Sequence, residues 1–373
     1  MEQSASLTGL PVEMLELVAR HTGKDMKKLR LVSRHIADGT FKIFKRTFFS
    51  EVKVFVTTKS SMEKAIQIVG STSLGPAVQR LTLTDDSFLG NPDEVRSNTA
   101  IRAKLDAQRK LREDGEYVKL LTELFRKCGR HASLSTIRIK AFVEGKDGPY
   151  RGESVLAVGS DDVFVAVMRA IVLSCASFDT LSMDMLAVDG DDYGKDNFSG
   201  LHIIQFGRHD HYGIASAAAL HRFKTLELIL QAGHENTKDV GQNFLAMIPH
   251  AKVRSLKIRP EFDSEDPQDN CSKLVIGALL ELDFPAMEIL ILRRAVVSWT
   301  SFVSFIKRQK SLRHLDLFHV GVNHVPEEVC SMLSADGNLD NNSVRERLSQ
   351  LAGVARVELS SCRFSNHILP SRW

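Results

Sequence analysis

The sequence predicts an α/β protein in which a short helical module precedes an irregular α/β solenoid. Two observations lead to this prediction. Apolar residues follow helical spacing through residues 11–49. Along the rest of the chain, a triplet of the form apolar-x-x-apolar-x-apolar recurs, and most copies follow a stretch with helical periodicity. With 43% hydrophobic and 25% charged residues among 373, the composition is that of a globular protein with a large core.

Three short helices are expected near the N-terminus. The first, over residues 11–21, starts at Pro11, because proline suits the first helical position, and Gly23 offers a stop. A second helix is expected after Asp25 and a third after Ser33, because each of these side chains can cap a helix. A core this small is marginal alone, so the module is expected to lean on another surface.

The repeated triplet predicts short strands, and the stretches between triplets predict helices and loops. The triplets are Val78/Leu81/Leu83, Leu134/Ile137/Ile139, Phe178/Leu181/Met183, Phe223/Leu226/Leu228, Val253/Leu256/Ile258, Met287/Leu290/Leu292, Leu312/Leu315/Leu317 and Val354/Val357/Leu359. Helices are expected at 62–69, 101–125, 163–173, 240–248, 274–282, 302–306 and 344–351. Loops rich in Gly, Asp, Pro or Ser are expected at 85–97, 141–160, 189–213 and 259–270.

Residues that alternate with the triplets should line an exposed face of the sheet, because successive strand residues point to opposite sides. The face is expected to include Thr82, Thr84, Ser182, Ser255, Ile289, Ile291 and His314. The candidates for substrate binding on it are Arg138, Lys140, Glu227, Lys257, Arg293, Asp316 and Phe318. Mixed charges with interspersed apolar residues suit a protein partner better than a phosphate backbone. For any one of these residues, a plain solvated surface is the alternative.

Two strings near the N-terminus carry a family resemblance. Leu10-Pro11-Val12-Glu13-Met14-Leu15 and Leu29-Arg30-Leu31-Val32-Ser33-Arg34 resemble the two halves of an F-box, at about the separation found in that family. The match covers residues 7–49. The remaining region, residues 50–373, is similar to the degenerate leucine-rich repeats of fungal F-box proteins, with inserted loops between the repeats.

The resemblance implies a substrate-recognition subunit of a Skp-cullin-F-box type ubiquitin ligase. The module would dock on a Skp-type adaptor, and through it on a cullin, with Leu10, Pro11, Leu15, Leu29 and Val32 as contacts. The repeats would bind a protein target, and the chain would be no enzyme and would need no cofactor. The alternative is a non-catalytic repeat scaffold whose N-terminal helices are only a structural cap.

The distribution of charge and of cysteines indicates the kind of partner and the cellular compartment. Between Lys24 and Arg46, eight basic residues stand against two acidic ones, whereas the whole chain carries a formal charge of only +3. This predicts one basic docking surface, and without aromatic residues interleaved for base stacking a nucleic-acid role is not expected. Five widely spaced cysteines, no secretory signal and no long apolar run predict a soluble protein of the cytoplasm or nucleus.

Catalytic constellations are sparse. His209-Asp210-His211, with His202 and His221 nearby, is the best candidate for a metal, but no third ligand follows at a fixed spacing. Asp189 and the acidic residues after it match no calcium loop. Phosphate-binding and nucleophile motifs are also missing from the sequence. We therefore predict no metal, and an enzyme that uses these histidines remains a third hypothesis.

Overall fold

The computed structural model describes most of the chain and both predicted regions. The described residues are 7–56, 58–84, 99–130, 134–140, 158–184, 201–202, 217–232, 248–260, 271–293, 295–327, 341–360 and 362–364. Most of the four expected loops and nearly all of the helix expected at 240–248 lie outside these ranges. So do the histidines at 209 and 211 and the aspartates at 189, 191, 192 and 196.

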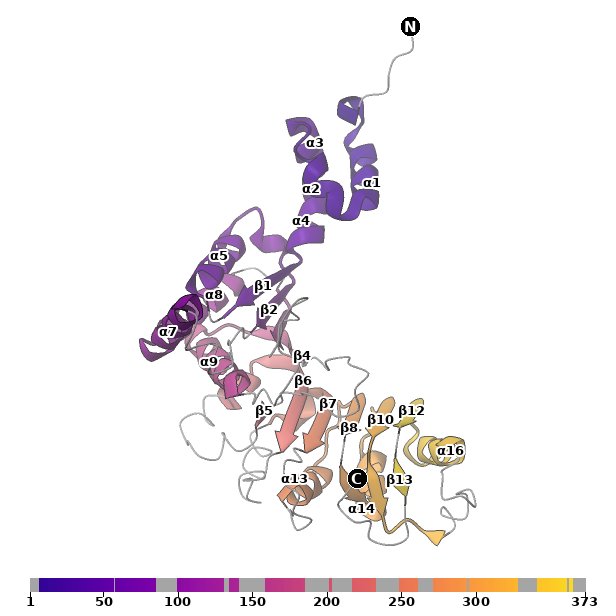
Figure 1. Ribbon diagram of the computed structural model, residues 1–373. Helices are drawn as coiled ribbons and strands as arrows, with labels where there is room; N and C mark the ends of the chain where they lie inside the picture. Colours follow the sequence, from indigo (N-terminus) through magenta and orange to yellow (C-terminus); the bar gives the residue numbers. More distant parts are fainter. Residues whose placement is uncertain are drawn as a thin grey trace.

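The N-terminal region is helical and stands beyond one edge of a long sheet (Figure 1). Its elements are the 3-10 turns η1 (Leu7–Gly9) and η2 (Gly23–Asp25) and the helices α1 (Val12–Thr22), α2 (Met26–Leu29), α3 (Arg34–Gly39) and α4 (Phe41–Phe49). Gly23 ends α1 with a positive φ of 52°, which glycine adopts without strain. The predicted cap at Ser33 is confirmed, because its hydroxyl accepts a hydrogen bond from the Ile36 N–H at 3.2 Å.

Two details of this region differ from the sequence prediction. Asp25 makes no side-chain capping bond to α2; its carboxylate instead forms an ion pair with Lys28 at 3.0 Å. The single third helix is divided into α3 and α4 around Thr40. Helical hydrogen bonding continues across this point, since Thr40 N–H donates to Ile36 and Phe44 N–H donates to Thr40.

A long parallel sheet forms the body of the molecule. Its strands are β1 (Glu51–Phe55), β2 (Arg80–Thr84), β3 (Thr136–Lys140), β4 (Phe178–Asp184), β5 (Leu201–His202), β6 (Phe223–Ala232), β7 (Val253–Pro260), β8 (Ile289–Arg293), β10 (His314–Phe318) and β12 (Arg356–Ser360). Nine of them lie in the order β1-β2-β3-β4-β6-β7-β8-β10-β12, and β5 pairs with β6 off this line. Each strand in the line is parallel to its neighbours.

Helices cover one face of this sheet. They are α5 (Lys59–Gly70), α7 (Thr99–Glu113), α8 (Glu116–Cys128), α9 (Val158–Ser174), α13 (Cys271–Leu280), α14 (Trp299–Arg308) and α16 (Asn341–Ala352), seen along one side of the strands in Figure 1. Short 3-10 turns η3 (Gly75–Ala77) and η4 (His250–Lys252) precede β2 and β7. Because parallel crossovers have one hand and the chain never reverses its direction across the sheet, successive helices return on the same side.

The predicted triplets form the inner face of the sheet. All eight mark strands of the structure, and every triplet residue is buried. The helix expected over 101–125 is broken into α7 and α8 at Gly115, where φ is +62°. Strand β5 lies inside the loop expected at 189–213, which corrects that prediction. Strand β1 was not predicted, although Phe49, Val52 and Val54 have the triplet spacing.

A second, smaller parallel sheet follows the last three long strands. It contains β9 (Val296–Ser298), β11 (Gly321–Asn323) and β13 (Arg363–Phe364), in the order β13-β11-β9. Each of these strands starts seven residues after the start of β8, β10 or β12, respectively. The chain is thus an α/β protein built on a parallel sheet. Among the described helices, none has the length and apolar character needed to cross a bilayer.

Candidate functional site

The N-terminal helices fold around a core of their own, separate from the core between the sheet and its helices. Ala19, Met26 and Ile43 are buried together at its centre, with Phe44 packed against them. We call this unit, residues 7–49, the helical module. It joins the sheet through Ser50, whose carbonyl accepts hydrogen bonds from the N–H groups of residues 79 and 80 at 2.9 Å. The module therefore has its own packing and does not need the sheet to bury its centre.

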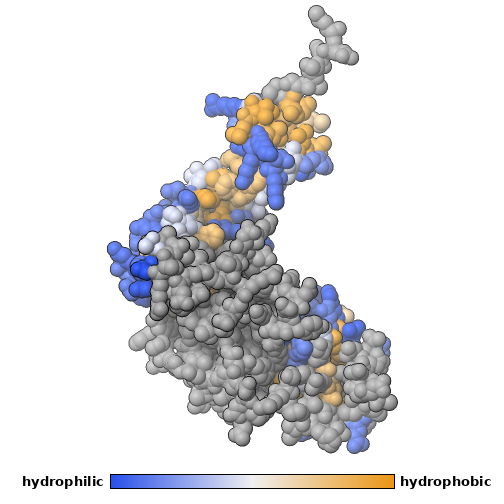
Figure 2. Space-filling view, viewed as in Figure 1, coloured by the Kyte–Doolittle hydropathy of each residue, from blue (hydrophilic) through white to orange (hydrophobic). Residues whose placement is uncertain are grey.

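Large apolar side chains remain on the surface of the module. Leu31 is 86% exposed and Val32 is 63% exposed, on the turn between α2 and α3. Figure 2 shows hydrophobic residues gathered over this part of the molecule, with hydrophilic side chains projecting beside them. The exposed large apolar residues of the module are Leu7, Val12, Met14, Leu17, Leu31 and Val32, which we call the apolar surface. Exposed apolar side chains gathered on one small unit are typical of an interaction site.

The predicted adaptor contacts divide into three groups. Pro11 and Val32 are exposed, as a contact surface requires, and Leu10 and Leu29 are half-buried. Leu15 is fully buried, so it supports the module from within and is not available as a contact in this structure. An ideal Cβ at Gly39 would lie only 2.9 Å from Leu15 Cδ1, which shows how closely α1 and α3 pack.

Sequence reasoning missed most of the apolar surface. The signal was present in the helical period of α1, because Leu15 and Ala19 are four residues apart and face inward together. Met14 and Leu17 are three residues apart and lie on a different face, where both remain exposed. The exposed apolar residues of α1 thus lie next to the predicted adaptor contacts of that segment but are different residues.

Cationic side chains cover the aromatic residues of α4. The prediction that no aromatic residues interleave with the basic residues of 24–46 is wrong, because Phe41 and Phe44 lie within that segment and cations stack on both rings. Arg30 lies 4.2 Å from the Phe44 ring centroid and donates a hydrogen bond to the Ala37 carbonyl at 2.6 Å. Burial lowers the pKa of Arg30, and nearby Asp38 opposes this shift. The other stacked pairs are Lys27 over Phe48, Arg30 over Phe41 and Lys45 over Phe41. These rings are thus occupied by contacts within the module.

Positive charge is concentrated on the same unit. Residues 7–50 contain nine Lys or Arg and four Asp or Glu, a net charge of +5. The whole chain is +3 and Glu2 contributes −1, so residues 51–373 sum to −1. A partner of the module would therefore meet an apolar surface beside a basic one.

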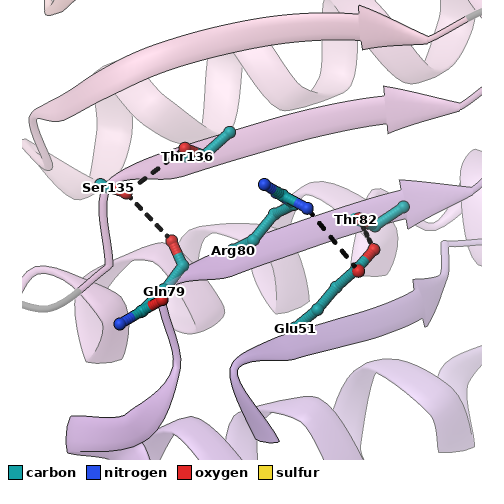
Figure 3. Close-up of polar contacts among 6 residues, drawn as sticks. All are labelled: Glu51, Gln79, Arg80, Thr82, Ser135 and Thr136. Atoms are coloured by element: carbon teal, nitrogen blue, oxygen red, sulfur yellow. Dashed lines mark hydrogen bonds and ion pairs between the residues drawn. The ribbon is translucent and has the colours of Figure 1, made fainter. Parts of the chain in front are cut away.

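At the β1 end, the polar groups of the sheet satisfy one another (Figure 3). Thr82 Oγ1 donates a hydrogen bond to Glu51 at 2.6 Å, and Arg80 lies 3.9 Å from the second carboxylate oxygen. Ser135 Oγ donates to the Gln79 carbonyl at 3.3 Å. Thr82 and Thr84 were expected to be exposed, but both are buried. The two threonines do lie on the predicted side of the strand, but their short side chains are covered by the surrounding residues.

The strands at the other end bring four predicted residues together. Lys257 of β7 pairs in register with Ile291 of β8, Ile291 with Asp316 of β10, and Asp316 with Glu358 of β12. Arg293 pairs with Phe318 in the next row, and its guanidinium carbon lies 5.3 Å from the ring centroid. The C-terminal sheet face is defined here as Ser255, Lys257, Ile289, Ile291, Arg293, His314, Asp316, Phe318, Arg356 and Glu358. Except for the exposed Arg356, these residues are half-buried.

Charges interact closely on this face. Burial raises the pKa of Asp316, while Arg293 acts to lower it and Glu358 to raise it. Glu358 forms an ion pair with Arg356, and His314 Nε2 lies 3.8 Å from the same carboxylate oxygen. The face is therefore a mixed surface in which each charge is modulated by a neighbour.

The other three candidates lie elsewhere on the sheet. Arg138 and Glu227 are two strands apart, each paired in register with Ser182, and both are half-buried. Lys140 ends β3, and its side chain lies outside the described part of the structure. These residues do not join the group around Asp316.

The described part of the chain contains no group of side chains placed to bind a metal, and two of its cysteines have a raised pKa. Among those residues, no group of three or more His, Cys, Asp or Glu side chains is placed to hold a metal ion. Burial raises the pKa of Cys128 to about 12, so this thiol stays protonated at physiological pH. Cys175 is exposed, and Cys362 is buried with its pKa raised by desolvation.

Comparison with known proteins gives no match, either to a model of a protein family or to an individual curated protein. The class of the protein therefore rests on its own fold and surfaces: an α/β protein with a parallel sheet, preceded by a helical module with exposed apolar residues.

Proposed function

We propose that the chain is the substrate-recognition subunit of a Skp-cullin-F-box type ubiquitin ligase. The helical module acts as an F-box and docks on a Skp-type adaptor, which links the chain to a cullin. The sheet region is a degenerate leucine-rich-repeat solenoid that binds a protein target. The observation that carries this proposal is the apolar surface on a module that already has a core of its own.

The competing reading, a structural cap, requires a different arrangement. A cap is useful to a repeat array because it buries the apolar end of that array under a polar outer face. Here the two cores are separate, and Leu31 and Val32 remain exposed. Burying a leucine or valine side chain is worth about 1.5–3 kcal/mol, so leaving several exposed favours a surface kept for a partner.

The solenoid part of the proposal is supported by a longer pattern than the triplet. Leucine-rich repeats follow the consensus L-x-x-L-x-L-x-x-N/C-x-L. Three stretches of the chain fit it when Ala or Val is allowed at the N/C position and Met, Val or Phe at the leucine positions: residues 287–297, 312–322 and 354–364. The second half of the pattern coincides with the small sheet of β9, β11 and β13.

Cys362 occupies the N/C position of the last stretch. Its Sγ donates a hydrogen bond to the Leu317 carbonyl at 3.2 Å, and so connects the last stretch to the one before it. A polar side chain at this position can therefore bond to backbone between neighbouring repeats, where backbone groups need partners. Ala295 and Val320 take the equivalent positions and are buried there.

In this role the chain needs no chemistry of its own. Held by the adaptor and cullin, it would bring a target close to the ubiquitin-loaded partner and raise the effective concentration of the reacting groups. Such a complex would act in the cytoplasm or nucleus. Non-catalytic binding agrees with a surface made of apolar residues and paired charges.

Adaptor binding by a charge-substituted variant tests the proposal. Leu31→Asp/Val32→Asp places two carboxylates in the apolar surface, and purified Skp-type adaptor should no longer co-purify with it. Because both side chains are exposed, the fold and the thermal midpoint should change little.

The matched control is Leu173→Asp, which changes another exposed leucine, 55% exposed on α9 and away from the module. This variant should keep adaptor binding. If wild-type protein binds no adaptor, or if the module variant binds as well as the control, the assignment as an F-box is wrong.

A further inference from the structure

The C-terminal sheet face has charges in a fixed order across its strands. One row of side chains reads Lys257, Ile291, Asp316 and Glu358, on β7, β8, β10 and β12. The cation stands at the β7 end, an apolar residue follows, and the two carboxylates stand at the β12 end. A partner complementary to this row would carry an acidic group, an apolar group and a basic group in that order.

The neighbouring rows add apolar and cationic side chains around this order. Ile289 and Phe318 flank the row near its centre, so the apolar part is larger than Ile291 alone. Arg293 of β8 reaches over the Phe318 ring of β10, so its guanidinium stands one row away from Asp316. At the far end, Arg356 and His314 both approach Glu358 through Oε1. That side chain is still 40% exposed, and a carboxylate has lone pairs on both oxygens to accept a further cation.

The size of the row fits an extended polypeptide. Neighbouring strands lie about 4.8 Å apart, so the three steps from β7 to β12 span about 14 Å. An extended chain rises about 3.3 Å per residue, so its side chains at positions i, i+2 and i+4 point to one side and span about 13 Å. One acidic, one apolar and one basic residue at alternate positions therefore match the row in both length and charge.

We propose that the C-terminal sheet face binds an extended protein segment of the form acid-x-apolar-x-base, lying across strands β7 to β12. Its acidic residue faces Lys257, its apolar residue packs on Ile291 and Phe318, and its basic residue faces Asp316 and Glu358. This inference rests on the proposed function in one respect: the bound segment is taken to belong to a ubiquitination target.

Synthetic peptides measure the preference directly with the full-length protein. The probe is a fluorescein-labelled peptide with the core Glu-Ser-Leu-Ser-Lys in Gly-Ser flanks, titrated by fluorescence anisotropy. Matched peptides carry Glu, Lys or Gln at both outer positions. The mixed peptide should bind best, and exchange of one favourable charge should weaken binding about fivefold, the upper range for an accessible ion pair.

Charge-reversal variants locate the site. Lys257→Glu should prefer the Lys-Ser-Leu-Ser-Lys peptide, and Glu358→Lys should prefer Glu-Ser-Leu-Ser-Glu. The control is Lys53→Glu, an exposed lysine on β1 of the same sheet, which should leave the peptide order unchanged. Two variants of opposite sign keep the test decisive if one of them fails to fold.

The inference is overturned if the mixed peptide binds no better than the neutral one, or if both folded variants keep the wild-type order. No adaptor is present in this assay, so its failure leaves adaptor docking untouched. Conversely, a peptide preference without adaptor binding would refute the ligase role and retain the peptide site.

Discussion

Gly39→Ala tests whether the helical module is an independent unit, because it perturbs only the contact between α1 and α3. The new Cβ would meet Leu15 Cδ1 at 2.9 Å, well inside ordinary van der Waals contact. Leu15 is fully buried, so its side chain cannot turn outward to make room. Overpacking of this kind costs about 1–3 kcal/mol, and replacing glycine near a helix end returns about 0.5 kcal/mol. We expect the module to lose about 0.5–2.5 kcal/mol of stability.

Amide hydrogen exchange is the assay that separates the module from the sheet. Exchange of protected amides in α1 should accelerate roughly tenfold for about 1.4 kcal/mol lost, while amides in β2 and β3 should keep their rates. Gly9→Ala is the matched control, because its Cβ would meet no atom within 4 Å. Equal acceleration in the module and the sheet would show one cooperative unit, and the separate-core argument for docking would fall with it.

Four further outcomes follow from charge, thiol chemistry and buried polar groups. Adaptor affinity should fall as salt rises, because residues 7–50 carry a net charge of +5; an affinity independent of salt would contradict electrostatic steering. Iodoacetamide at mildly alkaline pH should label Cys175 and spare Cys128, as peptide mass spectrometry would show. Gln309→Leu leaves the buried Phe284 N–H without its 2.8 Å acceptor and should cost about 1–3 kcal/mol in urea unfolding. Burial raises the pKa of the Asp316 carboxyl in the folded protein, so the folded protein binds the carboxyl proton more tightly than the unfolded chain does, and stability falls as pH rises through the folded-state pKa. In urea titrations, Asp316→Asn should therefore be more stable than wild type at neutral pH, and this difference should shrink on acidification.

The strands could be predicted from sequence because the last two residues of each apolar triplet alternate with other residues, as expected when one face of a strand is buried. Leu290 and Leu292, or Leu315 and Leu317, alternate with half-buried residues throughout. Strand β1 was not predicted because Phe49 is both the last residue of α4 and the first residue of the triplet that leads into β1. A residue with two local roles cannot be assigned from a period alone.

Exposure was harder to predict than secondary structure. Alternation places Thr82 on the outer side of the sheet, but its hydroxyl is bound to Glu51 and the side chain is buried. Likewise Leu15 belongs to the predicted F-box string, but tight packing at Gly39 buries it while Leu31 stays exposed. Both outcomes depend on neighbours brought in by tertiary packing, which a single sequence does not specify. The strands of the small sheet are two or three residues long, too short for any periodic signal.

The order of the strands separates the two proposed interactions in space. The module joins the sheet beside β1. The row of side chains that starts at Lys257 begins on β7, the sixth strand of the line and five steps from β1. Five steps of about 4.8 Å place Lys257 about 24 Å from the β1 end, beyond two Debye lengths at physiological salt. Effects at sites this far apart with no shared partner are normally additive. In the proposed complex, the parallel sheet would therefore act as a spacer between the target and the adaptor, without either interaction altering the other.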